Sequence, residues 1–173
     1  MKQIIFLTFL LLTGFQNLTA QVSEANNKII ATYEGFPPVP FEAPDLAGEK
    51  HFLLDYKEKV VVLYFWNMKD EKAKEYLMMM NDLSAEFKSD DVVILSFADE
   101  DKATLEKFTQ KAYIQFPIIP NAKGLAEMGY ADKLGYPRAF VIDKFGIIQK
   151  LITSESENFY AELKESIKKY LEL

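Results

Sequence analysis

Apolar and polar residues follow patterns along the chain that predict an α/β domain. Val60–Trp66 is a continuous apolar run rich in β-branched and aromatic residues, and a second apolar run covers residues 91–99. Such runs are typical of central strands that are covered on both faces. Between them, apolar positions from Asp70 to Phe87 recur at spacings of three and four residues. That spacing predicts a helix with one buried face.

The rest of the chain continues this order. The patterns predict helices over 101–113 and 122–128, strands over 138–143 and 147–152, and a last helix that begins with a capping box of Ser154 and Glu157. The proline-rich segment 35–50 excludes helix and central strand. We therefore expect an N-terminal extension over 21–37, as an edge strand or a loose tail, and one folded domain over 38–173.

The first twenty residues resemble a targeting segment. Lys2 precedes an apolar run from Ile4 to Leu12, and a polar stretch then ends at the small residue Ala20. This layout is typical of a cleaved secretory signal peptide over 1–20, and the run is short for a membrane span. An uncleaved anchor or a buried strand is the alternative. We expect a periplasmic or secreted protein with no stable membrane anchor after cleavage and no lipid anchor.

The composition excludes several function classes. Hydrophobic residues make up 49% and aromatic residues 14% of the 173 residues, which is typical of a folded domain. The net charge is −6 without a basic cluster, which argues against nucleic-acid binding because that requires a positive surface. The chain has no cysteine, so disulfides, thiolate ligands and thiol nucleophiles are all excluded.

Other kinds of chemistry have little support in the sequence. His51 is the only histidine, and we interpret it as a surface or capping residue. The glycines 124, 129 and 135 are spaced too widely for a phosphate-binding loop. Met78–Met80 is interpreted as core packing and not as a copper site. The sequence therefore predicts no cofactor and no metal centre.

Four segments, in the correct order, resemble a known family. They are APDLAG (43–48), DYKEKVVVLYFW (55–66), FPIIPN (116–121) and GYPRAFVIDKFGII (135–148). Together they resemble the TlpA-like thiol–disulfide reductases of the thioredoxin superfamily, close to the redoxin and AhpC/TSA group. The resemblance implies a thioredoxin-like α/β fold, with a central mixed sheet and helices on both faces.

The chain departs from that family where its chemistry takes place. Counting from Trp66, the two family cysteine positions hold Asp70 and Ala73. Disulfide exchange needs an attacking thiolate and a second, resolving thiol, so we expect no catalytic residue here. Asp70 has a structural explanation, since a carboxylate stabilises a helix N-terminus, and Asn67 is a competing cap. A cation site formed with Glu71 is the weaker alternative.

The resemblance also implies a recognition surface. It consists of Trp66 and of the loop at Tyr136-Pro137, which we predict to be cis and to lie against residues 67–70. A partner peptide would pair with this loop in strand fashion, with Trp66 and Tyr136 as aromatic anchors and Asn67, Asp70 and Pro137 beside them. The alternative is that the cis turn only shapes the fold. Arg138 is interpreted as an ordinary surface residue.

Three functions follow from these observations. The first is an extracytoplasmic, redox-inactive module that binds a protein or peptide. The second is a thiol–disulfide oxidoreductase or antioxidant protein, as the family resemblance alone would imply. The third is an accessory subunit of an envelope complex that docks through the acidic helix start at Asp70 and Glu71.

Overall fold

The computed structural model describes residues 21–88, 91–110 and 113–173, which form parts of two compact units, 1–32 and 33–173. The predicted signal peptide, residues 1–20, lies outside the described residues. Over those described, no helix is both long and apolar enough to cross a membrane. The strand or loose tail predicted for the extension is wrong for 21–30, which are helical. An ion pair of 2.8 Å between Glu24 and Lys28, one turn apart, supports this helix.

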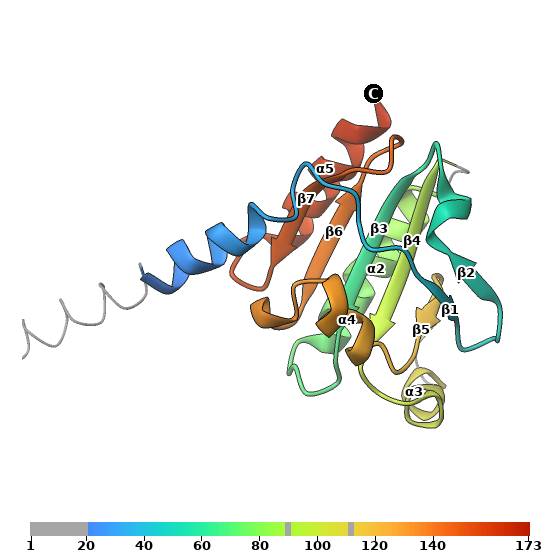
Figure 1. Ribbon diagram of the computed structural model, residues 1–173. Helices are drawn as coiled ribbons and strands as arrows, with labels where there is room; N and C mark the ends of the chain where they lie inside the picture. Colours follow the sequence, from blue (N-terminus) through green and yellow to red (C-terminus); the bar gives the residue numbers. More distant parts are fainter. Residues whose placement is uncertain (1–20, 89–90, 111–112) are drawn as a thin grey trace, which may run out of the picture. The chain divides into compact units, whose positions relative to one another are not determined.

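The second unit is built around a five-stranded sheet in the order β5-β4-β3-β6-β7, visible in Figure 1. Its strands are β3 (Val60–Trp66), β4 (Val92–Ala98), β5 (Ile118–Ile119), β6 (Arg138–Ile142) and β7 (Ile148–Thr153). β3 pairs with β4 in parallel and with β6 antiparallel, and β6 and β7 form a hairpin. The predicted central mixed sheet is confirmed.

The two faces of β3 support different layers of the domain. Val62, Tyr64 and Trp66 belong to a core that includes residues of α2 (Ala73–Glu86) and α5 (Phe159–Leu171). Phe65, which points to the opposite face, stacks on Phe97 at 4.7 Å between ring centroids. Every residue of β3 is buried, as its continuous apolar sequence predicted.

The opposite face is covered by the first part of the proline-rich segment 35–50 and by α4 (Lys123–Gly129), which lie in front of the sheet in Figure 1. Phe41 contacts Phe97 edge to face at 5.1 Å between ring centroids. The Tyr130 hydroxyl donates a hydrogen bond to the Val39 carbonyl. Gly129 is required here because a Cβ at this position would overlap the Val39 side chain. Helices and extended chain therefore cover both faces of the sheet.

The remaining elements are a two-stranded sheet of β1 (Glu42–Pro44) and β2 (Lys50–Phe52), the turn η1 (Leu53–Tyr56), helix α3 (Lys102–Thr109) and the turn η2 (Asp132–Leu134). The predicted capping box of Ser154 and Glu157 is wrong. Asn158 caps α5 by accepting a hydrogen bond from the Ala161 N–H. The Ser156 hydroxyl instead binds the Glu162 carboxylate.

Candidate functional site

Four of the five predicted binding residues lie around one pocket of about 400 Å³. They come from two separate segments, the loop after β3 and the loop before β6. The residues that line the pocket are Asn67, Lys69, Asp70, Lys72, Tyr76, Tyr136, Pro137 and Ser154. The structure thus brings together Asn67, Asp70, Tyr136 and Pro137, which the sequence separates by more than sixty residues. The fifth predicted residue, Trp66, does not line this pocket.

The first wall of the pocket is a turn held mostly by hydrogen bonds between its own residues, with one further bond of 2.7 Å from the Met68 N–H to the Glu100 carboxylate. The Asn67 side-chain oxygen accepts hydrogen bonds of 3.1 Å from the N–H groups of Lys69 and Asp70. The Asp70 carboxylate accepts one of 2.9 Å from the Lys72 N–H. α2 begins only at Ala73, so Asp70 precedes the helix by three residues and stabilises the turn that leads into it. Both capping interpretations from the sequence are therefore wrong for the helix itself, since the N-cap of α2 is Lys72 and no side chain caps it.

The predicted role of Trp66 as an aromatic anchor is incompatible with its position. Its side chain is 1% exposed, so no partner reaches it from the surface. The indole Nε1–H donates a hydrogen bond of 2.7 Å to the Ser96 hydroxyl on the neighbouring strand, and the ring lies 5.8 Å from that of Phe108. As the last residue of a strand buried on both faces, Trp66 belongs to the core under α2.

The second wall is the segment before β6. The peptide bond between Tyr136 and Pro137 is cis, Pro137 is buried and Tyr136 is half-buried. The Tyr136 hydroxyl donates a hydrogen bond of 2.5 Å to the Asp99 carboxylate. Burial, and then this hydrogen bond, raise the pKa of Tyr136 well above its usual value, so the hydroxyl stays protonated. Within the described chain, the main-chain N–H and C=O of Tyr136 make no hydrogen bond.

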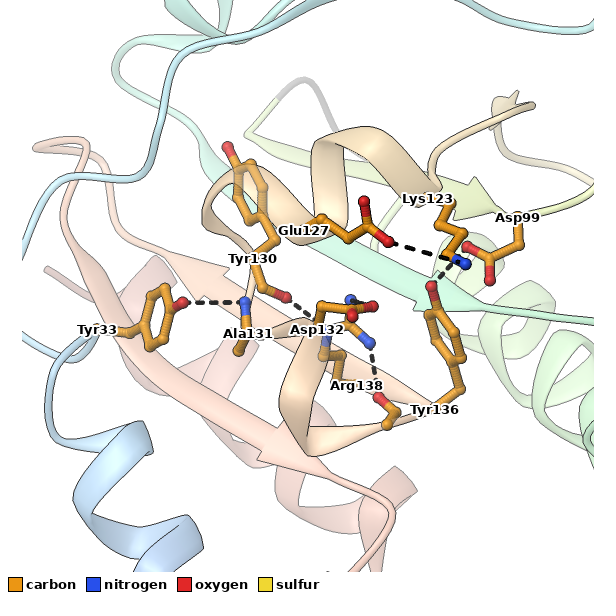
Figure 2. A network of polar contacts seen from close by, with 10 residues as sticks. Tyr33, Asp99, Lys123, Glu127, Tyr130, Ala131, Asp132, Tyr136 and Arg138 are labelled. Atoms are coloured by element: carbon orange, nitrogen blue, oxygen red, sulfur yellow. Dashed lines mark hydrogen bonds and ion pairs between the residues drawn. The ribbon is translucent and has the colours of Figure 1, made fainter.

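Arg138 holds this wall from inside the domain (Figure 2). It is the only arginine of the chain and is 0% exposed, so the predicted surface position is wrong. Its Nε donates to the Tyr130 carbonyl and one terminal nitrogen to the Gly135 carbonyl, both at 2.6 Å. The guanidinium therefore joins the two ends of the turn that precedes the Tyr136-Pro137 bond.

Aromatic rings and a carboxylate compensate for burying this charge. The guanidinium carbon lies 4.5 Å from the ring centroid of Tyr136 and 5.0 Å from that of Phe65. Its second terminal nitrogen lies 3.9 Å from the Asp132 carboxylate and has no hydrogen bond in the described chain. Burial lowers the pKa of Arg138 below its usual value, and the nearby Tyr136, Asp132 and Asp99 oppose that shift. The charge is therefore kept, stacked between two rings.

The turn that Arg138 clamps contains an unusual backbone conformation. Ala131, between α4 and η2, has a φ of 53°, in the left-handed region that a side chain disfavours. Its N–H donates a hydrogen bond of 3.0 Å to the Tyr33 hydroxyl, which Figure 2 also shows. One signal for this cluster is visible in the sequence, because the only arginine directly follows the predicted cis-proline. Asp99 and Asp132 carried no such signal.

The arrangement at the two family cysteine positions contains no thiol nucleophile. Asp70 lines the pocket with a half-buried carboxylate, and Ala73 is a buried methyl group at the start of α2. A carboxylate does not exchange disulfides, because that reaction needs a thiolate. Over the described residues, no group of three or more histidine, aspartate or glutamate side chains is arranged to hold a metal ion.

The only histidine lies away from this pocket and is buried, so the interpretation as a surface residue is wrong. His51 Nε2 is 3.2 Å from the Asp45 carboxylate, and its Nδ1 is 2.6 Å from the Tyr56 hydroxyl. These three side chains connect the β1–β2 sheet to η1. Their hydrogen bonds satisfy both ring nitrogens, which is sufficient reason for a buried histidine.

Comparison with known proteins places this geometry in a family. The model of the AhpC/TSA family matches residues 36–151. Thiol-disulfide oxidoreductase ResA of Geobacillus thermodenitrificans is 33% identical over 134 residues, 76% of this chain and 72% of the relative. ResA of Geobacillus kaustophilus is 30% identical over 174 residues, 99% of this chain and 93% of the relative.

Solved structures share the fold. A putative thiol:disulfide interchange protein DsbE from Chlorobium tepidum superposes with a TM-score of 0.72 at 21% identity, covering 80% of this chain and 97% of that one. A putative protein disulfide isomerase from Bacteroides thetaiotaomicron gives a TM-score of 0.71 at 21% identity, with 81% and 91% covered. The fold is therefore thioredoxin-like.

Proposed function

The chain belongs to the AhpC/TSA family of thioredoxin-like proteins, and we propose that it serves there as a redox-inactive module that binds an extended protein segment. The observation that carries this proposal is the pocket itself. Its two walls bring Asn67 and Asp70 against Tyr136 and Pro137, while the chain has no thiol. Relatives named as thiol-disulfide oxidoreductases act on disulfides, whereas this chain would bind a polypeptide without that reaction.

Main-chain pairing is the mode of binding that this wall favours. The N–H and C=O of Tyr136 are unused within the described chain, although the segments on both sides are tied to the domain. An extended peptide that satisfied both groups would add a short strand-like contact. Because Arg138 and Asp99 already fix the loop, little conformational entropy would be lost on binding. Tyr136 and Pro137 provide apolar surface beside the pairing groups.

The residues at the two family cysteine positions, Asp70 and Ala73, restrict what this site can do. Asp70 would meet a polar or basic group of the partner, since its carboxylate lines the pocket between Lys69 and Lys72. Ala73 contributes no reactive atom. We therefore expect affinity to depend on shape and main-chain pairing, with only a modest electrostatic contribution from this half-exposed carboxylate.

The test uses insulin B chain with alkylated cysteines, an unfolded polypeptide that cannot form a disulfide. Residues 21–173, labelled with nitrogen-15, are titrated with it and followed by NMR. We expect shifts at Asn67, Asp70 and Tyr136. Binding should be lost in Tyr136→Ala, because this change removes the ring over Arg138 and the hydrogen bond to Asp99 that together hold the pairing main chain in place. The matched control is Tyr113→Ala, which removes an exposed tyrosine outside this pocket. Binding that survives Tyr136→Ala, or insulin reduction above the buffer rate, would contradict the proposal.

An extracytoplasmic location is part of the same proposal. Its support is the apolar run Ile4–Leu12 after Lys2 and the small residue Ala20. N-terminal sequencing of protein made in a bacterial host with an envelope checks it. We expect a mature chain that begins at Gln21 in the envelope fraction, and an intact N-terminus in the cytosol would contradict this location.

A further inference from the structure

A second groove, distinct from the pocket described above, lies between α2 and α3. Its volume is about 580 Å³. The residues that line it are Lys74, Leu77, Met78, Asn81, Lys107, Phe108, Tyr113 and Ile114. None of them lines the Tyr136-Pro137 pocket. The groove has an apolar floor and two lysines on its rim.

Two large side chains in this groove are unusually exposed. The Tyr113 side chain is 82% exposed and that of Met78 is 69% exposed. Leu77 lines the groove as a buried residue of α2, and Phe108 lines it as a half-buried residue of α3. Protein interaction sites are enriched in exposed aromatic and methionine side chains that surround apolar surface.

The wall that carries Tyr113 is held in place by Asn81 of α2. The Asn81 side-chain amide donates a hydrogen bond of 2.5 Å to the Tyr113 carbonyl, and its oxygen accepts one of 2.9 Å from the Gln115 N–H. One side chain thus fixes the main chain on both sides of Ile114. The Tyr113 ring is therefore presented outward from an anchored backbone, so a partner would find this wall already formed.

The rim of the groove is positive in a chain of net charge −6. Lys74 and Lys107 are both exposed, and neither forms an ion pair within the described residues. Lys74 Nζ lies 5.8 Å from the ring centroid of Phe108, so this ammonium group stays over the groove. The charge of the rim selects a partner that carries carboxylates.

From these observations we propose that the groove between α2 and α3 binds an amphipathic helix of a partner protein, with apolar side chains on one face and acidic residues beside them. The apolar face would lie over Leu77, Met78 and Tyr113, as in other complexes in which a helix fills a groove. The acidic residues would pair with Lys74 and Lys107. This site is independent of peptide binding at Tyr136-Pro137.

The experiment uses a synthetic helical peptide with leucine and phenylalanine at spacings of three and four and glutamate beside them. Its control replaces every glutamate by lysine. On nitrogen-15-labelled residues 21–173, we expect the acidic peptide to shift Met78, Asn81 and Tyr113 and to leave Asn67 and Tyr136 unchanged. The basic peptide should cause no saturable shift. Equal binding of both peptides, or shifts confined to Tyr136, would overturn the proposal and leave the peptide pocket unaffected.

Charge-reversed variants test the rim directly. Lys74→Glu with Lys107→Glu should weaken binding of the acidic peptide by about tenfold. The matched control is Lys57→Glu with Lys168→Glu, which gives the same net charge at two exposed positions elsewhere and should bind as the parent does. Equal losses in both double variants would show a nonspecific charge effect and overturn the proposal.

Two further measurements distinguish other occupants. Anionic phospholipid vesicles are expected not to co-sediment with the protein, and sedimentation equilibrium is expected to show a monomer. Vesicle binding that Lys74→Glu abolishes would assign the groove to a membrane surface. A dimer that Tyr113→Ala dissociates would assign it to a second copy of the chain. Either of these results would overturn the proposal.

Discussion

The two walls of the Tyr136-Pro137 pocket are built in contrasting ways. The wall from Asn67 to Lys72 is a polar turn near the surface. Most of its hydrogen bonds run between its own neighbouring residues, and one joins the Met68 N–H to the Glu100 carboxylate. The wall before β6 is tied to the interior by a buried arginine that bonds the Tyr130 and Gly135 carbonyls. The first wall carries Asp70, which occupies one of the two positions at which the family resemblance places a cysteine. The second wall only fixes the shape of the pocket.

This contrast explains how the chain can lose a reaction and still keep a shaped surface. Replacing a side chain that binds main-chain N–H groups in the 67–72 turn lowers the free energy of unfolding by about 1 kcal/mol. Removing a buried, hydrogen-bonded charge costs several times more, because its partners are left unpaired. We therefore expect changes in the clamp formed by Tyr130, Gly135, Tyr136 and Arg138 to have the larger effects.

The largest effect is expected for Arg138→Met. This change fills part of the same space but leaves the Tyr130 and Gly135 carbonyls without their donors, and we expect a loss of about 3 kcal/mol in the free energy of unfolding. Urea unfolding followed by circular dichroism measures it. Lys133→Met, at an exposed position on the same turn, should change stability by less than about 0.5 kcal/mol. Equal effects of the two changes would mean that Arg138 is no clamp.

An intermediate effect is expected for Tyr136→Phe. The variant keeps the ring over Arg138 but removes the hydrogen bond to Asp99, which should cost about 1 kcal/mol because the freed carboxylate can still be hydrated. The same unfolding measurement applies. Peptide binding should persist, since the main-chain groups of residue 136 remain. Full loss of binding would assign recognition to the hydroxyl and not to the main chain.

The smallest effect is expected for Asp70→Ala. The variant loses the hydrogen bond within the turn from the Lys72 N–H to the Asp70 carboxylate, and we expect the free energy of unfolding to fall by about 0.5–1 kcal/mol. Glu71→Ala, at the neighbouring exposed position, is the control, and its free energy of unfolding should fall by less. If Asp70→Ala instead cost as much as Arg138→Met, the proposed difference between the two walls would be wrong.

The sequence predicted the fold well where one signal dominates. The apolar run Val60–Trp66 forms the predicted strand with the same ends, because a strand covered on both faces needs an apolar residue at every position. The periodic helices were also predicted, but their ends shifted. α2 begins three residues after Asp70 because Asn67 and Asp70 bind main-chain N–H groups of the preceding turn. The spacing of apolar residues does not predict such hydrogen bonds, so it does not predict the residue at which the helix begins.

The candidate site was predicted only in part, for a different reason. The position of Asn67, Asp70, Tyr136 and Pro137 in one pocket agrees with the prediction, whereas Trp66 and Arg138 are buried. Arginine is seldom buried, so its burial is decided by partners distant in sequence, here Phe65 and the Tyr130 carbonyl. Those contacts exist only after β3, η2 and β6 have assembled.

The hydrogen-exchange rate of the Tyr136 amide tests the central proposal most directly. NMR on residues 21–173 would measure this rate with and without the alkylated insulin B chain. Because the free Tyr136 N–H has no partner in the described chain, we expect it to exchange quickly alone and at least about tenfold more slowly when a peptide strand pairs with it. An unchanged rate at saturating peptide would contradict main-chain pairing at this site.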